Sequence, residues 1–398
     1  MLIKARPYSY VILILVCLCA PLHGQKVDSL AKNLVDTLKH KLIVDDIPKK
    51  TFWDKFIYPH RWYVKQLLAH HKTDFDTTYV FSAKKKLTLT IPVAKSYYGF
   101  NVKDLSTKKT LKFSPNNYYH LGFNIGNIIL NFGFYPGIKF GAKAGKGSTK
   151  SRDYQVTFIG RRVITDVNYQ HYQGFYVFNA SDYSVNMLNA PAVFIRPDIS
   201  VFSFGVNTLF VFNFKRFSLR GAFTFTDIQR KSAGTFMAGL YHSYQLFTSS
   251  DSTLVSTKLR TDFSPQVYDI THISLITVGL SAGYGYTFVY KKIIVSSAIN
   301  AGFGEQKTNY TTSDGHDHTL HINPSVHFNA RGAARYDNLR FFIGIMSTYD
   351  TNYSLNPQVF NTGNYIAKLL LFSGYRFHIK RDGRKILRAM GLVDYKMR

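Results

Sequence analysis

The chain has 398 residues, of which 45% are hydrophobic, and this composition excludes wholesale disorder. Its 28 Tyr and 33 Phe make it rich in aromatic residues, and 50 Lys and Arg against 23 Asp and Glu give a formal net charge of +27. After the N-terminal region there is no run of about 18 apolar residues, which excludes a helical membrane protein.

Residues 1–24 have the pattern of a cleaved export signal. A short positive region precedes an apolar run over 11–20, and the small residue Gly24 ends the segment. An uncleaved anchor helix is the alternative, but the apolar run is too short to span a bilayer. Cys17 and Cys19 are the two cysteines of the chain, so the mature protein is predicted to have no thiol and no disulfide.

Residues 25–84 are predicted to form a periplasmic segment. Over 26–45 the apolar positions recur at helical spacing, with charged residues on the other face. This spacing predicts one amphipathic helix ahead of the remaining chain.

The hydrophobic period then changes to two. Over 273–290 the even positions are apolar and end in aromatic residues, whereas the odd positions are small and polar. The same alternation recurs over 128–134, 202–213, 217–226 and 369–378. Such segments are predicted to be β-strands with one apolar face, and several are long enough to cross a bilayer at a tilt.

Connection lengths favour a membrane barrel over a soluble sandwich, which would also alternate. Tight turns are expected at Lys215-Arg216, Lys291-Lys292 and Asp337-Asn338, whereas long polar loops are expected over 102–118, 137–152, 179–198, 305–319 and 350–364. We therefore predict an all-β fold, an antiparallel transmembrane β-barrel over 85–379 followed by a basic tail over 380–398.

The strand count tests this interpretation, because both termini of such a barrel fall on the short-turn side. Fourteen strands are expected, and twelve is the rival count. Two features needed for fourteen have weak patterns, a turn near Thr165-Asp166 and a strand over 253–261. The fourteen expected strands cover 86–101, 119–126, 128–136, 153–163, 166–178, 199–213, 217–226, 235–247, 253–261, 273–290, 293–304, 320–335, 339–349 and 365–379.

An ordered set of short motifs resembles the domain-of-unknown-function 4421 family, exported barrel-like proteins of Bacteroidetes-type bacteria. The motifs span roughly residues 74–379 and include Asp76-Thr77-Thr78-Tyr79-Val80, Phe113-Ser114-Pro115-Asn116, Tyr172-Gln173-Gly174-Phe175-Tyr176, Arg196-Pro197-Asp198 and Gly283-Tyr284-Gly285-Tyr286-Thr287. The resemblance implies an outer-membrane barrel. It supplies no activity, cofactor or functional residue.

One histidine-rich loop is the best candidate for a metal site. His316 and His318 are two residues apart, and His321 or Asp317 could complete the ligand set of a cation. A solvated loop tip is the simpler interpretation, and it is the one we favour.

A basic loop is the candidate for anion contact, and its residues are Lys139, Lys143, Lys146, Lys150 and Arg152. At the cell surface this loop could pair with lipopolysaccharide phosphates. Plain solubility explains the loop equally well.

Other cations lie beside strands, at Arg161-Arg162, Arg196 and Arg230-Lys231. If they face the lumen, they would favour anionic solutes, whereas interior salt bridges would instead plug a narrow barrel.

The function expected from the sequence is a structural, surface or small-pore role in the outer membrane, biased toward anionic solutes or lipopolysaccharide. A membrane-embedded lipid-modifying enzyme and a soluble periplasmic sandwich that binds an apolar ligand are the alternatives. We expect no enzyme, because Ser243 and His242 face opposite sides of one strand. No cofactor is expected. Nucleic acid is not expected as a partner, since the chain is exported and has no nucleic-acid-binding module.

Overall fold

The computed structural model describes residues 75–378, apart from 84–85, 117–118, 127–129, 136, 139–140, 184–193 and 251–252. The predicted export signal, the amphipathic helix over 26–45 and the basic tail over 380–398 lie outside the described residues. The chain divides into two compact units, and the described residues belong to the unit that covers 72–378. Within them, no helix combines the length and hydropathy needed to cross a bilayer.

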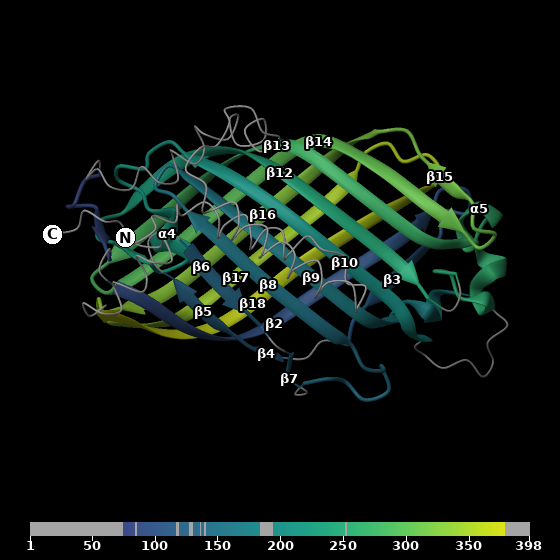
Figure 1. Ribbon diagram of the computed structural model, residues 1–398, viewed down its shortest axis with the longest axis horizontal. Coiled ribbons are helices and arrows are strands. Elements are labelled where there is room, and N and C mark those ends of the chain that lie inside the picture. The colour runs from purple at the N-terminus through teal and green to yellow at the C-terminus, as the bar shows by residue number, and fades with distance from the viewer. Residues whose placement is uncertain are drawn as a thin grey trace, which may run out of the picture. The chain divides into compact units, whose positions relative to one another are not determined.

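The described strands form a closed antiparallel ring with twelve strand positions (Figure 1). Strand β18 pairs with β2 over their full length, from Phe360 opposite Asp104 to His378 opposite Lys86, and this pairing leaves the wall no free edge. Two positions are each shared by a pair of short strands, β4 with β5 and β6 with β7. The wall strands are β2 (Lys86–Asp104), β4 (Tyr119–Leu121), β5 (Phe123–Gly126), β6 (Leu130–Phe134), β7 (Gly137–Ile138), β8 (Lys150–Ile159), β9 (Val163–Val177), β10 (Phe194–Val211), β12 (Ala233–Ser249), β13 (Ile270–Tyr290), β14 (Ile293–Thr312), β16 (Asn323–Asp337), β17 (Phe341–Ser354) and β18 (Phe360–His378).

The wall is apolar outside and polar inside, the reverse of a soluble protein. On β13 the side chains of Val278 and Leu280 are exposed, whereas those of the flanking Thr277 and Ser281 are buried. The turn-side ends of the strands carry exposed aromatic residues such as Tyr290. An apolar outer band bordered by aromatic residues is typical of a bilayer-spanning barrel. This arrangement confirms the predicted fold class and excludes a sandwich.

The two ends of the barrel differ in their connections. Tight turns join β13 to β14 and β16 to β17 at one end, which we call the turn side. Longer connections occupy the other end, the loop side, and contain β3 (Thr110–Ser114), η2 (Ala180–Asp182), η3 (Thr257–Asp262), α5 (Pro265–Tyr268) and β15 (Asp317–Thr319). Figure 1 shows α4 (Leu219–Phe223) at the turn side and α5 and β15 at the opposite end.

The strand predicted over 217–226 is wrong. Ser218 caps helix α4 by accepting a hydrogen bond from the Gly221 backbone N–H at 3.1 Å. The chain then continues into β11 (Asp227–Gln229), which pairs with β1 (Val80–Ser82). The expected tight turn at Lys215-Arg216 is therefore part of a long connection.

The weak strand predicted over 253–261 is also wrong, because its residues enter the 3-10 helix η3. The turn expected near Thr165-Asp166 lies earlier, at residues 160–162, so β8 and β9 are separate strands as predicted. With two predicted strands lost, the wall has the rival count of twelve rather than fourteen.

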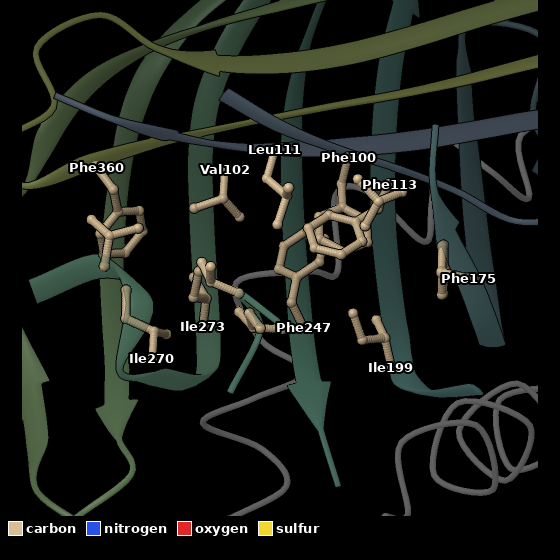
Figure 2. Close-up of a cluster of buried hydrophobic side chains, with 14 of the residues drawn as sticks. Phe100, Val102, Leu111, Phe113, Phe175, Ile199, Phe247, Ile270, Ile273 and Phe360 are labelled. Atoms are coloured by element: carbon tan, nitrogen blue, oxygen red, sulfur yellow. The ribbon is translucent and has the colours of Figure 1, made fainter. Parts of the chain in front are cut away.

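A large apolar cluster fills the loop-side end of the lumen (Figure 2). Wall residues such as Phe100, Phe247 and Ile273 point inward, and Phe100 stacks on Phe113 of β3 with the ring centroids 4.4 Å apart. The β12–β13 connection completes the cluster with buried Leu254, Val255, Leu259, Phe263 and Val267. The prediction that the inner face is small and polar is therefore wrong at this end.

Candidate functional site

A polar chamber of about 150 Å³ lies in the middle of the barrel. It forms because every second residue of the wall strands faces inward, and these residues are mostly amides and hydroxyls at this height. The amide side chains among them are Asn124, Asn131, Gln155, Asn168, Gln170, Asn207, Gln245, Asn329 and Asn352.

Two ion pairs cross the lumen between strands that are not neighbours in the wall. Arg331 of β16 lies 2.8 Å from Asp166 of β9, and Asp166 also accepts a hydrogen bond from the Thr157 hydroxyl. Lys368 of β18 lies 2.5 Å from Asp153 of β8. Since each cation has a carboxylate partner, these two pairs contribute no net positive charge to the chamber.

A histidine–aspartate pair is the third charged feature of the chamber. His327 Nε2 lies 3.0 Å from the Asp350 carboxylate, and Asn329 donates to the same oxygen at 2.8 Å. The Tyr241 ring packs against His327, with the centroids 4.4 Å apart.

A nucleophile for this pair is not found among the described residues. His327 Nδ1 has no hydrogen-bond partner there. The Ser243 hydroxyl is contacted instead by the Asn352 amide, at 3.5 Å. His242 is exposed on the outer face, so it and Ser243 point to opposite sides of β12, as the sequence predicts. The hydrogen bonds therefore do not assemble a Ser–His–Asp triad.

The connection between β10 and β12 packs inside the turn-side end of the barrel, with Asp227 at its centre. We call residues 213–231 of this connection the turn-side plug, and the apolar cluster at the other end the loop-side plug. The buried Asp227 carboxylate accepts hydrogen bonds from the Ser218 hydroxyl and the Arg220 guanidinium, each at 2.9 Å, and Arg161 lies 3.6 Å away. Burial alone would raise the pKa of Asp227. The charges of Arg220 and Arg161 and the two hydrogen bonds outweigh burial and hold that pKa below its ordinary value.

The turn-side plug is fastened to the wall by a buried arginine. Arg376 of β18 donates through Nε to the Phe225 carbonyl at 2.9 Å, and its two other nitrogens bind Asp337 of β16. Phe225 stacks on Phe372 at 4.4 Å between ring centroids. The plug, β16 and β18 are thus held at one point.

Of the five cations noted beside strands, Arg161 and Arg196 form carboxylate contacts, whereas Arg162, Arg230 and Lys231 pack over aromatic rings. Arg196 forms a two-pronged contact with Asp198 and also donates to the backbone carbonyls of Thr253 and Leu254. Arg161 lies against Asp227, as described above. Arg230 is exposed and packs over the Phe81 ring at 4.9 Å. The alternative of interior salt bridges thus describes Arg161 and Arg196 better than a basic lining does.

The histidines of the candidate metal loop lie at the exposed tip between β14 and β16. His316 Nδ1 contacts Asp314 at 2.8 Å, and His318 stacks on Tyr310. Hydrogen bonds from the Thr312 hydroxyl and the His316 backbone lower the pKa of Asp314 to about 2. His321 is also exposed. Within the part of the chain that the structure describes, no group of three His, Cys, Asp or Glu side chains is arranged to hold a metal.

The basic loop is ordered by a single buried amide. Asn116 donates to the carbonyls of Lys143 and Gly147 and accepts from the Lys143 N–H, at 2.7 to 2.9 Å. Lys146 packs over the Tyr176 ring at 4.6 Å, and Lys143 is exposed. Lys150 and Arg152 are also exposed, but they lie at the start of β8 and not in the predicted loop. Lys139 lies outside the described residues. Asn116 was missed from the sequence, although it ends the Phe113–Asn116 motif.

The closed ring, the apolar outer band and the polar middle of the lumen define a transmembrane β-barrel. The chain belongs to the family described as "Domain of unknown function (DUF4421)", whose model matches residues 74–377. No curated protein shows significant sequence similarity to it.

Several solved outer-membrane structures match this chain at low sequence identity. The outer membrane protease OmpT from Escherichia coli is 9% identical, with 74% of this chain and 97% of that chain covered and a TM-score of 0.33. The COG4313 outer membrane channel from Pseudomonas putida F1 is 9% identical, with 74% and 96% covered and a TM-score of 0.32. The beta domain of the Bordetella autotransporter BrkA is 13% identical, with 72% and 98% covered and a TM-score of 0.33.

Proposed function

We propose that this protein is an exported, non-catalytic outer-membrane barrel that is closed to free diffusion and acts at the cell surface through its cationic loop side. The plugged lumen is the observation that carries the proposal. In this role the N-terminal 24 residues direct export and are removed, and the barrel wall contacts outer-membrane lipid.

The two plugs support a closed state because they differ in chemistry and are both tightly packed. Apolar burial holds the loop-side plug, where Phe113 and Leu259 are fully buried. The turn-side plug is held by the ion pair between Arg161 and Asp227 and by the hydrogen bond from Arg376 to the Phe225 carbonyl. A solute would have to displace both plugs to cross the barrel.

Conductance across a planar bilayer tests this part of the proposal. The full-length protein is expected to give no steady current. In a second variant, short Gly-Ser linkers replace residues 213–231 and 253–268. This variant is expected to conduct, because side chains alone fill the interior of an eight-strand barrel but not the wider interior of a twelve-strand barrel. Vesicle flotation verifies that both proteins insert. A steady current from the unmodified protein contradicts the proposal.

The basic loop supports the surface role. Asn116 fixes its backbone, so Lys143 and Lys146 are presented without a large loss of loop entropy on binding. Phosphate groups of lipopolysaccharide are suited to such a loop, because ammonium and guanidinium groups form charge-assisted hydrogen bonds with phosphate oxygens.

A binding titration with purified lipopolysaccharide tests the surface role. The loop-side variant carries Lys143→Gln, Lys146→Gln, Lys150→Gln and Arg152→Gln. Its affinity is expected to fall about tenfold or more, since exposed ion pairs contribute about 0.2–1 kcal/mol each, and the loss is expected to shrink as salt is added. The matched control removes four turn-side cations with Lys86→Gln, Lys291→Asn, Lys292→Gln and Arg340→Gln. Equal losses in both variants would indicate attraction by net charge alone and would contradict the assignment to this loop.

A further inference from the structure

We propose that the turn-side rim of the barrel contains a binding site for an anionic glycerophospholipid, formed by Lys86, Lys291, Lys292 and Arg340. We call these four residues the cationic rim. The site is on the opposite end of the barrel from the basic loop, so this inference goes beyond the proposed function and does not depend on it.

The cationic rim is one continuous feature because hydrogen bonds join the connections that carry it. The Asp337 N–H donates to the Lys292 carbonyl at 2.8 Å, which links the β13–β14 turn to the end of β16. The Lys86 ammonium donates to the Leu339 carbonyl at 3.3 Å, which links the start of β2 to the β16–β17 turn. The Arg376 N–H donates to the Arg340 carbonyl at 2.8 Å. The two turns and the start of β2 therefore present their cations along one stretch of the rim.

The rim lies at the edge of the apolar outer band, where phospholipid headgroups are found. The Tyr290 and Tyr336 side chains face outward, 57% and 42% exposed. The Lys291 ammonium lies over the Tyr290 ring at 5.4 Å, and Lys292 lies over Tyr336 at 5.9 Å. Aromatic rings mark the boundary between hydrocarbon and headgroups, so these two ammonium groups lie at the level of lipid phosphates.

Carboxylates of the described residues do not neutralise the rim. Within the described residues, no ion pair involves any of its four members. Asp337 is the carboxylate in this stretch of wall, but it is buried and engaged by Arg335 and Arg376. The local charge therefore remains strongly positive and attracts an anion from outside the protein.

The chemistry of the rim favours a lipid over a free anion. Lys291 and Lys292 offer charge to a phosphodiester. The exposed Phe341 and Tyr375, which are paired with each other next to Arg340, offer apolar surface to acyl chains. Inorganic phosphate would use only the first of these contacts. Phosphatidylglycerol, which carries one negative phosphodiester and two acyl chains, fits both.

Lipid retention tests the proposal. The full-length protein is reconstituted into vesicles of equal phosphatidylglycerol and phosphatidylcholine, extracted in mild detergent, and its retained lipid is measured by mass spectrometry. The ratio of retained phosphatidylglycerol to phosphatidylcholine is expected to be about tenfold above the bulk ratio in the unmodified protein. The reason is that several basic residues close together attract an anionic lipid but not a zwitterionic one. Millimolar glycerol phosphate is expected not to displace the lipid.

Two matched variants make the test specific. The turn-side variant Lys86→Gln, Lys291→Asn, Lys292→Gln and Arg340→Gln is expected to bring the ratio close to the bulk value. The loop-side variant with four cations removed at Lys143, Lys146, Lys150 and Arg152 is expected to keep the enrichment. If the turn-side variant does not fold, the exposed pair Lys291→Asn and Lys292→Gln is used, with an expected loss of at least half of the enrichment. No enrichment in the unmodified protein, displacement by glycerol phosphate, or equal retention by both quadruple variants overturns the proposal.

Discussion

Arg376 and Asp337 form a bidentate ion pair inside the turn-side end of the barrel, with both N–O distances at 2.8 Å and both side chains fully buried. The pair joins β18 to β16 across the intervening β17. Arg335 donates to the same carboxylate at 3.1 Å, so a single acid balances two buried guanidinium groups.

The first prediction follows from that charge balance. Asp337→Asn leaves Arg335 and Arg376 buried without a carboxylate, and removing one partner of a buried pair typically costs about 3–5 kcal/mol. The free energy of unfolding, measured by urea titration in lipid vesicles, is expected to fall by this amount. Asp314→Asn removes an exposed acid and is expected to change it by less than about 0.5 kcal/mol. A change of similar size in both variants would show that the buried pair is not stabilising the wall.

The second prediction concerns pH. Because the folded state lowers the pKa of Asp227 below the ordinary 3.8, its charge stabilises the fold fully above that value, and the contribution is lost as pH falls through the folded pKa. The difference in unfolding free energy between the unmodified protein and Asp227→Asn is therefore expected to be constant from neutral pH to about pH 4 and to shrink below it. A difference that grows on acidification contradicts the assignment of a charged Asp227 to the plug.

The third prediction separates lipid-facing from water-facing leucines. Leu280 is 66% exposed on β13, and Leu355 is 49% exposed in the β17–β18 connection. Leu280→Arg is expected to destabilise the barrel in vesicles by about 2–4 kcal/mol, because it places a charge in the hydrocarbon band. Leu355→Arg is expected to have little effect, since that position lies on the loop side. Equal effects at the two sites would mean that the outer band does not face lipid.

The fourth prediction concerns the basic loop. Asn116→Ala removes three hydrogen bonds to the backbone of Lys143 and Gly147, each contributing about 1 kcal/mol. Trypsin cleavage after Lys143 and Lys146 is expected to become about 10 to 100 times faster. Cleavage after Lys258, in a different connection, serves as the control and is expected to keep its rate. Unchanged cleavage at the basic loop would show that Asn116 does not order it.

The wall could be predicted from sequence because lipid imposes a strict alternation on each strand. The segment around Leu280 alternates apolar and small residues for its whole length, and the structure places it as β13. The turns at Lys291-Lys292 and Asp337-Asn338 were also predictable, because they separate two such segments.

The plugs could not be predicted by the same reasoning. Phe217, Leu219, Phe223 and Phe225 alternate with polar residues, yet they are buried in the turn-side end of the barrel rather than turned to lipid. An apolar residue satisfies either environment, so alternation alone does not separate wall from plug. The available signal in the sequence was Ser218, because serine is favoured at the N-cap of a helix, and the structure shows it capping α4.

The charged pairs of the lumen depend on long-range register. Arg331 meets Asp166 because β9 and β16 lie opposite each other around a ring of twelve, not fourteen, positions. Individual strands do not encode that number, so the partners of the interior cations could not be read from sequence.

The closure of the barrel is tested most directly by engineering a disulfide between β2 and β18, where the ring closes. Val93 of β2 is paired with Leu371 of β18, and both side chains face outward. In a chain with Cys17 and Cys19 changed to Ser, the pair Val93→Cys and Leu371→Cys is expected to oxidise readily. After boiling without reductant, that protein is expected to migrate as a covalently closed ring, distinct from its reduced form.

The control Val93→Cys with Leu369→Cys is two residues out of register, beyond the usual reach of a disulfide. Rapid cross-linking of the first pair alone supports the closed barrel. No cross-link in that pair, or equal cross-linking in both, contradicts the closure of β2 on β18.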